Sequence, residues 1–283
     1  MTAGLSYCAE EVRRHDRDRF LTTLFAPGAA REDYCTVLAF NLEIARTREV
    51  VSEPLLGEMR LQWWRDAVTA AYADDVRTTG HQVLDPLTEL IRRARLPEGL
   101  IQALIDGRGA DLSEQPVADE AELEAYADGT AGALNRLLAA VAAPQTDPDL
   151  MAQVTEAGII WGMTGILRRV GFDARQGRIL LPTSLFQRHD VDPHDLFGGH
   201  MSPGLRAGLG EMADAVRARA NAFRANPPPR NGAVRSLFMQ VNLADMYIGR
   251  LRRLRYDVFG RDIEGGRPGR QIRLAFSALW GRY

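Results

Sequence analysis

Apolar residues recur at intervals of three and four residues along most of this chain, whereas convincing two-residue alternation is absent. In residues 31–51, for example, Tyr34, Leu38, Leu42 and Ala45 form one stripe. This spacing is typical of amphipathic helices, because residues three and four apart lie on the same helical face. We therefore predict an all-α fold. The expected helices cover residues 6–20, 31–51, 55–73, 83–95, 97–107, 119–141, 148–170, 205–225 and 233–256.

Length alone would allow two domains, but a single-domain helical bundle over residues 1–283 is the simplest architecture. A chain of 283 residues, 46% of them hydrophobic, can bury a substantial core. Its formal net charge of −2 does not favour electrostatic attraction to nucleic acid, so we expect no nucleic-acid partner. All 35 basic residues are arginine, which excludes a Schiff-base lysine and a Walker-type phosphate loop.

The cysteines and the chain start indicate a reducing compartment. Cys8 and Cys35 lie too far apart in sequence for a zinc or redox pattern, so we expect buried free thiols. The first twenty residues carry several acidic side chains, which fits neither a signal peptide nor a transit peptide. The longest nearly apolar run, residues 157–167, is well short of the ~20 residues of a bilayer span. We expect a cytoplasmic protein whose membrane contact is at most peripheral.

Residues 165–182 look like a metal-binding helix in which one acid has been replaced. Arg169 and Asp173 are four residues apart, so they share a helical face. A magnesium site for diphosphate would need carboxylates at both positions, because Mg²⁺ takes hard oxygen ligands. Arg169 cannot lose its proton. We expect it to pair with Asp173 instead, a contact of about 0.3 kcal/mol.

The same predicted helix carries Gly158, Gly162 and Gly165 at spacings of four and three. Glycine in a helix interior costs about 1 kcal/mol relative to alanine, so three on one face suggest a reason. Either another helix packs closely against this face, or the face borders a cavity for an elongated ligand.

This segment resembles the second aspartate-rich motif of the squalene/phytoene synthase family. That motif reads Asn-Ile-Leu-Arg-Asp-Val-Gly-Glu-Asp and continues to Gly-Arg and Leu-Pro. The resemblance implies an all-α isoprenoid (terpenoid) synthase fold, whose enzymes join two prenyl diphosphates head to head with Mg²⁺. Here Gly165 replaces Asn, Arg169 replaces the first Asp and Phe172 replaces Glu, while Asp173, Gly177 and Arg178 are retained.

The first motif of the family, Asp-Asp-x-x-Asp, is also altered. Residues 45–49 read Ala-Arg-Thr-Arg-Glu, and only Glu49 keeps an acid. By resemblance, Glu49 and Asp173 are the metal ligands that would remain. The simultaneous change in both motifs indicates a catalytically lapsed protein, a pseudoenzyme, for which we expect no cofactor.

A narrower resemblance points to the branch of the family that contains mitochondrial complex I assembly factor 6. It is carried by Phe-Asn-Leu-Glu-Ile-Ala at residues 40–45, Val-Ser-Glu at 51–53 and Met-Arg-Leu-Gln-Trp-Trp at 59–64, with a weaker echo at 279–283. The resemblance implies a role in complex I assembly, with complex I subunits or assembly intermediates as partners. Because the chain starts directly at the domain, it is similar to a bacterial relative acting at the inner face of the plasma membrane.

Motif position also implies a binding site. The old substrate cavity would hold a prenyl (isoprenoid) or acyl lipid, or a client peptide, and arginine forks at its mouth would meet a phosphate in place of Mg²⁺. The polar mouth would be lined by Glu49, Arg65, Tyr126, Arg169, Asp173 and Arg178.

Two alternatives stay open. The first is an active Mg²⁺-dependent transferase of farnesyl or geranylgeranyl groups, in which Glu49 and Asp173 hold the metal. The second is a plain lipid-binding bundle with no link to complex I.

Two further clusters allow a functional or a structural interpretation. Residues 188–195 gather His and Asp side chains, but Asp192 as N-cap and Pro193 as first helical residue explain this loop without a metal. Four arginines near the end of the last predicted helix form either a solvated face or a contact with anionic lipid or an acidic partner. They are Arg250, Arg252, Arg253 and Arg255.

Overall fold

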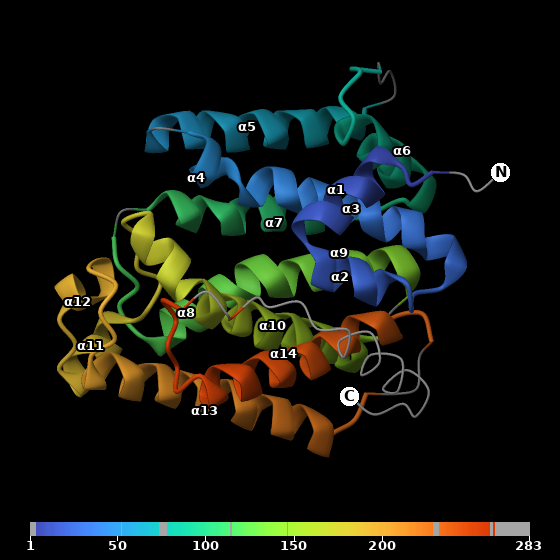
Figure 1. Cartoon of the computed structure of the whole chain (residues 1–283). Coiled ribbons are helices and arrows are strands. Elements are labelled where there is room, and N and C mark those ends of the chain that lie inside the picture. Colours follow the sequence, from blue (N-terminus) through green and yellow to red (C-terminus); the bar gives the residue numbers. More distant parts are fainter. Residues whose placement is uncertain are drawn as a thin grey trace. The chain divides into compact units, whose positions relative to one another are not determined.

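The computed structural model describes residues 4–51, 53–73, 78–113, 115–145, 147–228, 232–260 and 263, and within these ranges it contains helices and turns but no β-strand (Figure 1). The predicted all-α fold is confirmed. The chain groups into two compact units, here called unit 1 (Met1–Ser113, Gly129–Thr155 and Pro228–Leu237) and unit 2 (Glu114–Asp128, Glu156–Pro227 and Phe238–Tyr283). A single domain over residues 1–283 stays a prediction. The sequence echo at residues 279–283 lies outside the described residues.

Unit 1 is built around α3, which packs against α1, α2, α6, α7 and α9. Two members of its predicted apolar stripe, Tyr34 and Leu38, are buried, whereas Leu42 and Ala45 are only partly buried. Cys8 and Cys35 are the free, buried thiols expected. Their burial raises the pKa of the Cys8 thiol to about 11 and that of the Cys35 thiol to about 12. The helices of this unit are α1 (Tyr7–His15), α2 (Arg17–Thr23), α3 (Arg31–Ala45), α4 (Thr47–Val50), α5 (Pro54–Ala71), α6 (Leu84–Ala94), α7 (Glu98–Gly109) and α9 (Ala133–Ala142).

Three helices predicted as continuous are broken in the structure. The helix over residues 6–20 is divided at Asp16. The Asp16 carboxylate accepts a hydrogen bond from the Arg19 backbone N–H (3.1 Å) and caps α2, so a new helix begins there. The helix over 31–51 is interrupted at Arg46, which ends α3 and precedes α4. The helix over 119–141 is divided by the π-helical turn η3 (Asp128–Gly132). Local side-chain capping and an irregular turn thus override a continuous apolar pattern.

Unit 2 contains shorter helices near α10 and α13. Its loop over residues 188–195 has the predicted cap, because the Asp192 carboxylate accepts from the His194 backbone N–H (2.8 Å) and Pro193 opens α12. The helices are α8 (Glu120–Ala127), α11 (Thr183–His189), α12 (Pro193–Phe197) and α13 (Pro203–Ala225); α10 (Pro148–Arg175) and α14 (Arg235–Arg253) contribute to both units.

The longest described helix, α10, runs five residues beyond the predicted end at Val170 and so includes Asp173. By length and composition α10 is the one helix in the described part of the chain that would suffice to cross a membrane, and 61% of its most apolar window is buried. The core helix of a globular protein has the same composition, and α10 is mostly buried against other parts of this chain.

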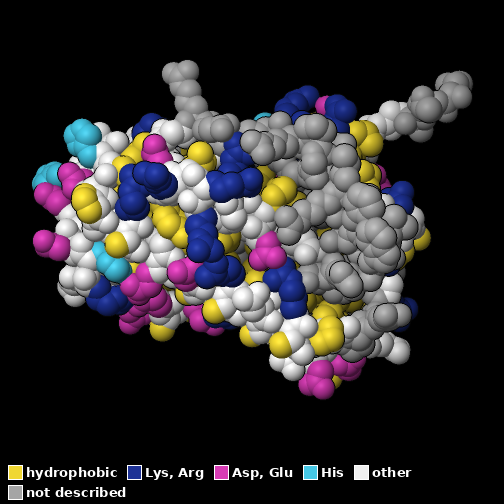
Figure 2. All heavy atoms as spheres, turned by 60° about the horizontal axis from the view of Figure 1, so that its bottom comes forward, with side chains coloured by type: hydrophobic (Ala, Val, Ile, Leu, Met, Phe, Trp, Pro, Cys, Tyr) yellow, Lys and Arg dark blue, Asp and Glu magenta, His cyan; other side chains and the backbone are white. Residues whose placement is uncertain are grey.

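Arginine side chains are spread over the face that carries α13 and α14, with acidic side chains between them (Figure 2). Arg252, Arg253 and Arg255 are exposed. The Arg253 Nε donates to the Gly249 carbonyl at 3.2 Å. A contact of this arginine cluster with lipid or an acidic partner stays a prediction.

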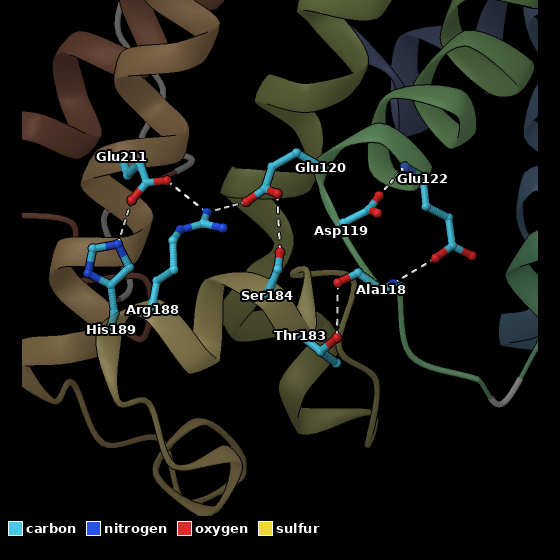
Figure 3. A network of polar contacts seen from close by, with 9 residues as sticks. All are labelled: Ala118, Asp119, Glu120, Glu122, Thr183, Ser184, Arg188, His189 and Glu211. Carbon is cyan, nitrogen blue, oxygen red and sulfur yellow. Dashed lines mark hydrogen bonds and ion pairs between the residues drawn. The ribbon is translucent and has the colours of Figure 1, made fainter.

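A polar network ties the start of α8 to α11 and α13 (Figure 3). The Arg188 guanidinium pairs with Glu120 and donates to Glu211 at 2.8 Å. The Ser184 hydroxyl donates to Glu120 at 3.1 Å, and His189 Nε2 lies 2.6 Å from a Glu211 oxygen. These contacts join segments of unit 2 that are far apart in sequence.

This network predicts a loss of stability in acid. The hydrogen bond from Arg188 lowers the pKa of Glu120, and the hydrogen bond with His189 lowers the pKa of Glu211. A carboxylate with a lowered folded pKa contributes stability above its unfolded value of about 4.3, and that contribution is lost as pH falls through the folded pKa. Chemical unfolding between pH 5 and pH 3 should therefore show a shallower pH slope for Arg188→Gln. Arg217→Gln on α13, at a partly exposed arginine that pairs with Asp214 of the same helix, is the control that should keep the slope. An unchanged slope in Arg188→Gln would contradict the assignment.

Candidate functional site

In unit 1, the first motif region is held by arginines from other helices. Asn41 is buried on α3, and its Oδ1 accepts a hydrogen bond from Arg108 Nη2 of α7 (3.0 Å). Glu43, two residues further along α3, pairs with Arg60 Nη2 of α5 (2.5 Å). Both polar side chains of the Asn-x-Glu pattern are thus engaged in contacts between helices.

Aromatic packing joins the same two helices. The Trp64 side chain of α5 is 0% exposed and meets the Phe40 ring of α3 edge-on, with ring centroids 5.2 Å apart. The His81 ring lies 5.4 Å from Trp64 and 5.7 Å from the neighbouring Trp63. The segments 40–45 and 59–64, which carry the branch resemblance, therefore contact each other directly.

The Glu43–Arg60 ion pair should couple these segments weakly but measurably. A double-mutant cycle with Glu43→Gln and Arg60→Gln should give about 0.5 kcal/mol of interaction in the free energy of unfolding, because both side chains are only partly shielded from water. The exposed Glu10–Arg13 pair within α1 is a control that should give no more. A coupling indistinguishable from zero would show that the contact contributes only to local geometry.

In unit 2, the retained acid of the second motif is buried. Asp173 is 3% exposed, and the guanidinium of Arg169 lies 3.3 Å from its Oδ1. The Arg169 side chain also lies over the Phe172 ring, 4.9 Å from its centroid. The predicted pairing across one helical turn is confirmed.

Asp173 and Arg178 line one small cavity of unit 2. Its volume is about 10 Å³, and Ile166, Val170 and Leu181 are among the apolar residues that line it. A space of this size holds about one water molecule. This cavity therefore has no room for a diphosphate.

The structure describes the predicted site residues within each unit separately. Arg65 on α5 pairs with Asp106 of α7 (Nε–Oδ1, 2.9 Å), and Glu49 is exposed on α4. The six residues are divided between the units: Glu49 and Arg65 belong to unit 1, whereas Tyr126, Arg169, Asp173 and Arg178 belong to unit 2. The six-residue cavity mouth stays a prediction.

The residues do not fit a magnesium ion bound to diphosphate. Of the two acids that the transferase alternative needs, Asp173 is buried and held by a fixed positive charge on Arg169. Across the described ranges, no three His, Cys, Asp or Glu side chains gather as a metal site would require. We derive no catalytic step through Mg²⁺.

Sequence reasoning missed the pairing of Asn41 and Glu43 with arginines. One signal was present: Asn41 follows Leu38 by three residues on the apolar side of the helix. A buried amide must find a partner, so a polar contact there was to be expected. Which arginine supplies it requires the fold.

Comparison with known proteins identifies a family and relatives with similar sequences. The model of the family described as squalene/phytoene synthase matches residues 12–274. NADH dehydrogenase (ubiquinone) complex I assembly factor 6 of Mus musculus is 27% identical over 259 residues, which are 89% of this chain and 75% of the relative. Phytoene synthase of Thermus thermophilus is 28% identical over 207 residues, 73% of this chain and 69% of that enzyme.

Solved structures agree on the fold. A dehydrosqualene synthase in complex with ligand matches with a TM-score of 0.82 at 17% identity, covering 96% of this chain and 94% of the other. Squalene synthase HpnC from Alicyclobacillus acidocaldarius matches with a TM-score of 0.74 at 18% identity, covering 88% and 93%. With the family model matching most of its length, this chain belongs to the squalene/phytoene synthase family.

Proposed function

We propose that this protein assists the assembly of respiratory complex I and does not condense prenyl diphosphates. Similarity to complex I assembly factor 6 over 89% of the chain supports the assembly role. The observation that carries the second part is the state of Asp173, which is buried and paired with Arg169. We place the protein in the cytoplasm, at the inner face of the plasma membrane of a bacterium.

The loss of chemistry has a physical reason. Ionising a prenyl diphosphate requires positive charge at the departing oxygens, which a metal ion held by carboxylates supplies. Arg169 brings one positive charge, yet it is bound to the carboxylate that would have held the metal. The arginine forks that remain suit recognition of a phosphate group rather than its departure.

We also propose that the protein binds a ligand in the cavity that corresponds to the substrate cavity of the family's enzymes. A Cβ built on Gly165 of α10 would meet no other atom within 4 Å, so open space borders this point of the glycine face. That observation speaks against close helix packing at Gly165 and leaves room for a ligand there. A prenyl or acyl lipid, or a client peptide, is the occupant that we propose.

Two measurements test the proposal. Purified protein with farnesyl or geranylgeranyl diphosphate, Mg²⁺ and NADPH should release no pyrophosphate above background, while Thermus thermophilus phytoene synthase serves as the active control. Deleting the gene in its host should reduce assembled complex I on native gels, and the wild-type chain should restore it. Intact complex I in the deletion strain would overturn the assembly role.

The second candidate function is an active prenyl-diphosphate transferase. The 28% identity to Thermus thermophilus phytoene synthase favours it. In that case, the turnover assay would give a C30 or C40 product, and Asp173→Asn would abolish it. Product formation insensitive to this substitution would show that Asp173 holds no metal.

A further inference from the structure

One face of α5 in unit 1 exposes large apolar side chains in a row. Leu55, Met59 and Trp63 follow one another at intervals of four residues and are 67%, 61% and 47% exposed. The opposite face of α5, with Leu61 and Trp64, is buried. We call the three exposed residues the apolar row. Exposed apolar residues in such a continuous arrangement mark interaction surfaces more often than scattered single ones.

A polar row runs beside the apolar row. Glu58, Gln62 and Asp66 are exposed at the same four-residue spacing, and Gln62 Nε2 donates to Asp66 at 2.8 Å. We call these three the acidic row. The two rows are adjacent ridges of one helix, the kind of surface against which a second helix packs.

We propose that this face of α5 docks a helical segment of a partner protein that carries an apolar stripe flanked by basic residues. Charge complementarity selects this occupant: Lys or Arg beside the partner's stripe would meet Glu58 and Asp66. The inference deepens the proposed assembly role, because it names the face that holds the client and the chemistry of the client segment.

The acidic row disfavours two other occupants. Carboxylates repel the anionic headgroups that attract peripheral proteins, so a membrane surface is a poor fit. An antiparallel pair of α5 helices related by a two-fold axis would set two acidic rows side by side, which opposes a second copy of this chain.

The test compares two fluorescein-labelled synthetic helices of equal length, one of leucine and lysine and one of leucine and glutamate. Fluorescence anisotropy with the full chain should show the lysine helix binding at least about tenfold more tightly. Met59→Glu should weaken that binding by a similar factor. Leu24→Glu, at a 45% exposed leucine after α2, is the matched control and should leave it unchanged.

The double variant Glu58→Arg with Asp66→Arg gives the sharper result. Both substitutions are at exposed positions, so the fold should survive, and the preference should invert toward the glutamate helix. Equal binding of both helices, or no binding, would overturn the proposal. So would capture on phosphatidylglycerol vesicles, or dimerisation, that Met59→Glu abolishes.

These outcomes are separate from those of the assembly proposal. Peptide binding is measured without complex I, so an intact docking face in a protein whose deletion leaves complex I unchanged would refute the assembly role alone. A lost peptide preference in a protein that complex I still requires would refute only the docking face.

Discussion

Trp64→Ala should lower the free energy of unfolding by about 3–5 kcal/mol, the loss typical of truncating a fully buried tryptophan. The indole is fully buried between α3 and the His81 ring, so its removal forfeits apolar burial and leaves a cavity. It also removes the edge-on contact with Phe40, worth about 1 kcal/mol beyond burial. Urea unfolding followed by circular dichroism measures the change.

Trp63→Ala is the matched control for this prediction. The two tryptophans are neighbours in sequence, but the Trp63 side chain is 47% exposed and its removal should cost only about 1 kcal/mol. On the docking proposal, the same substitution should weaken binding of the lysine helix. Equal losses of stability for the two variants would contradict the burial that separates them.

Periodicity was sufficient to predict the fold class and most helices, because amphipathic helices bury every third or fourth residue. It failed where a side chain competes with the helix. Asp16 lies within an apolar pattern that continues on both sides, yet its carboxylate caps α2 and ends α1. The prediction of a continuous helix through η3 failed for another reason. Here the backbone approaches α7 closely, since a Cβ at Gly107 would lie 2.0 Å from the Gly129 carbonyl oxygen. The local sequence pattern does not encode such a contact between distant segments.

In the candidate site, too, contacts within one helix were predictable from the sequence, whereas contacts between helices were not. The pairing of Arg169 with Asp173 was predictable, because helical geometry alone places residues four apart together. Arg60 and Arg108, in contrast, reach Glu43 and Asn41 across 17 and 67 residues of sequence. Motif similarity implies that such residues belong to one site, but only the packing of helices decides which partner each one finds.

Gly171 lies in the strongest motif segment of the chain, yet the structure gives it a packing role. A Cβ at this position of α10 would lie 2.2 Å from the Val258 carbonyl oxygen and 3.4 Å from the Phe259 ring. The obstacle is backbone, which cannot move aside as a flexible side chain would. The fold can therefore require a residue of the motif independently of catalysis.

Gly171→Ala should accordingly destabilise unit 2 by about 3 kcal/mol, because the added methyl group overpacks a backbone contact. Gly165→Ala, on the same helix, should instead stabilise by up to about 1 kcal/mol, since its Cβ would meet open space and alanine favours the helix. Chemical unfolding of both variants decides the matter. A stabilised Gly171→Ala would remove the packing explanation for this glycine. A destabilised Gly165→Ala would mean that close packing, rather than a cavity, accounts for the glycine face of α10.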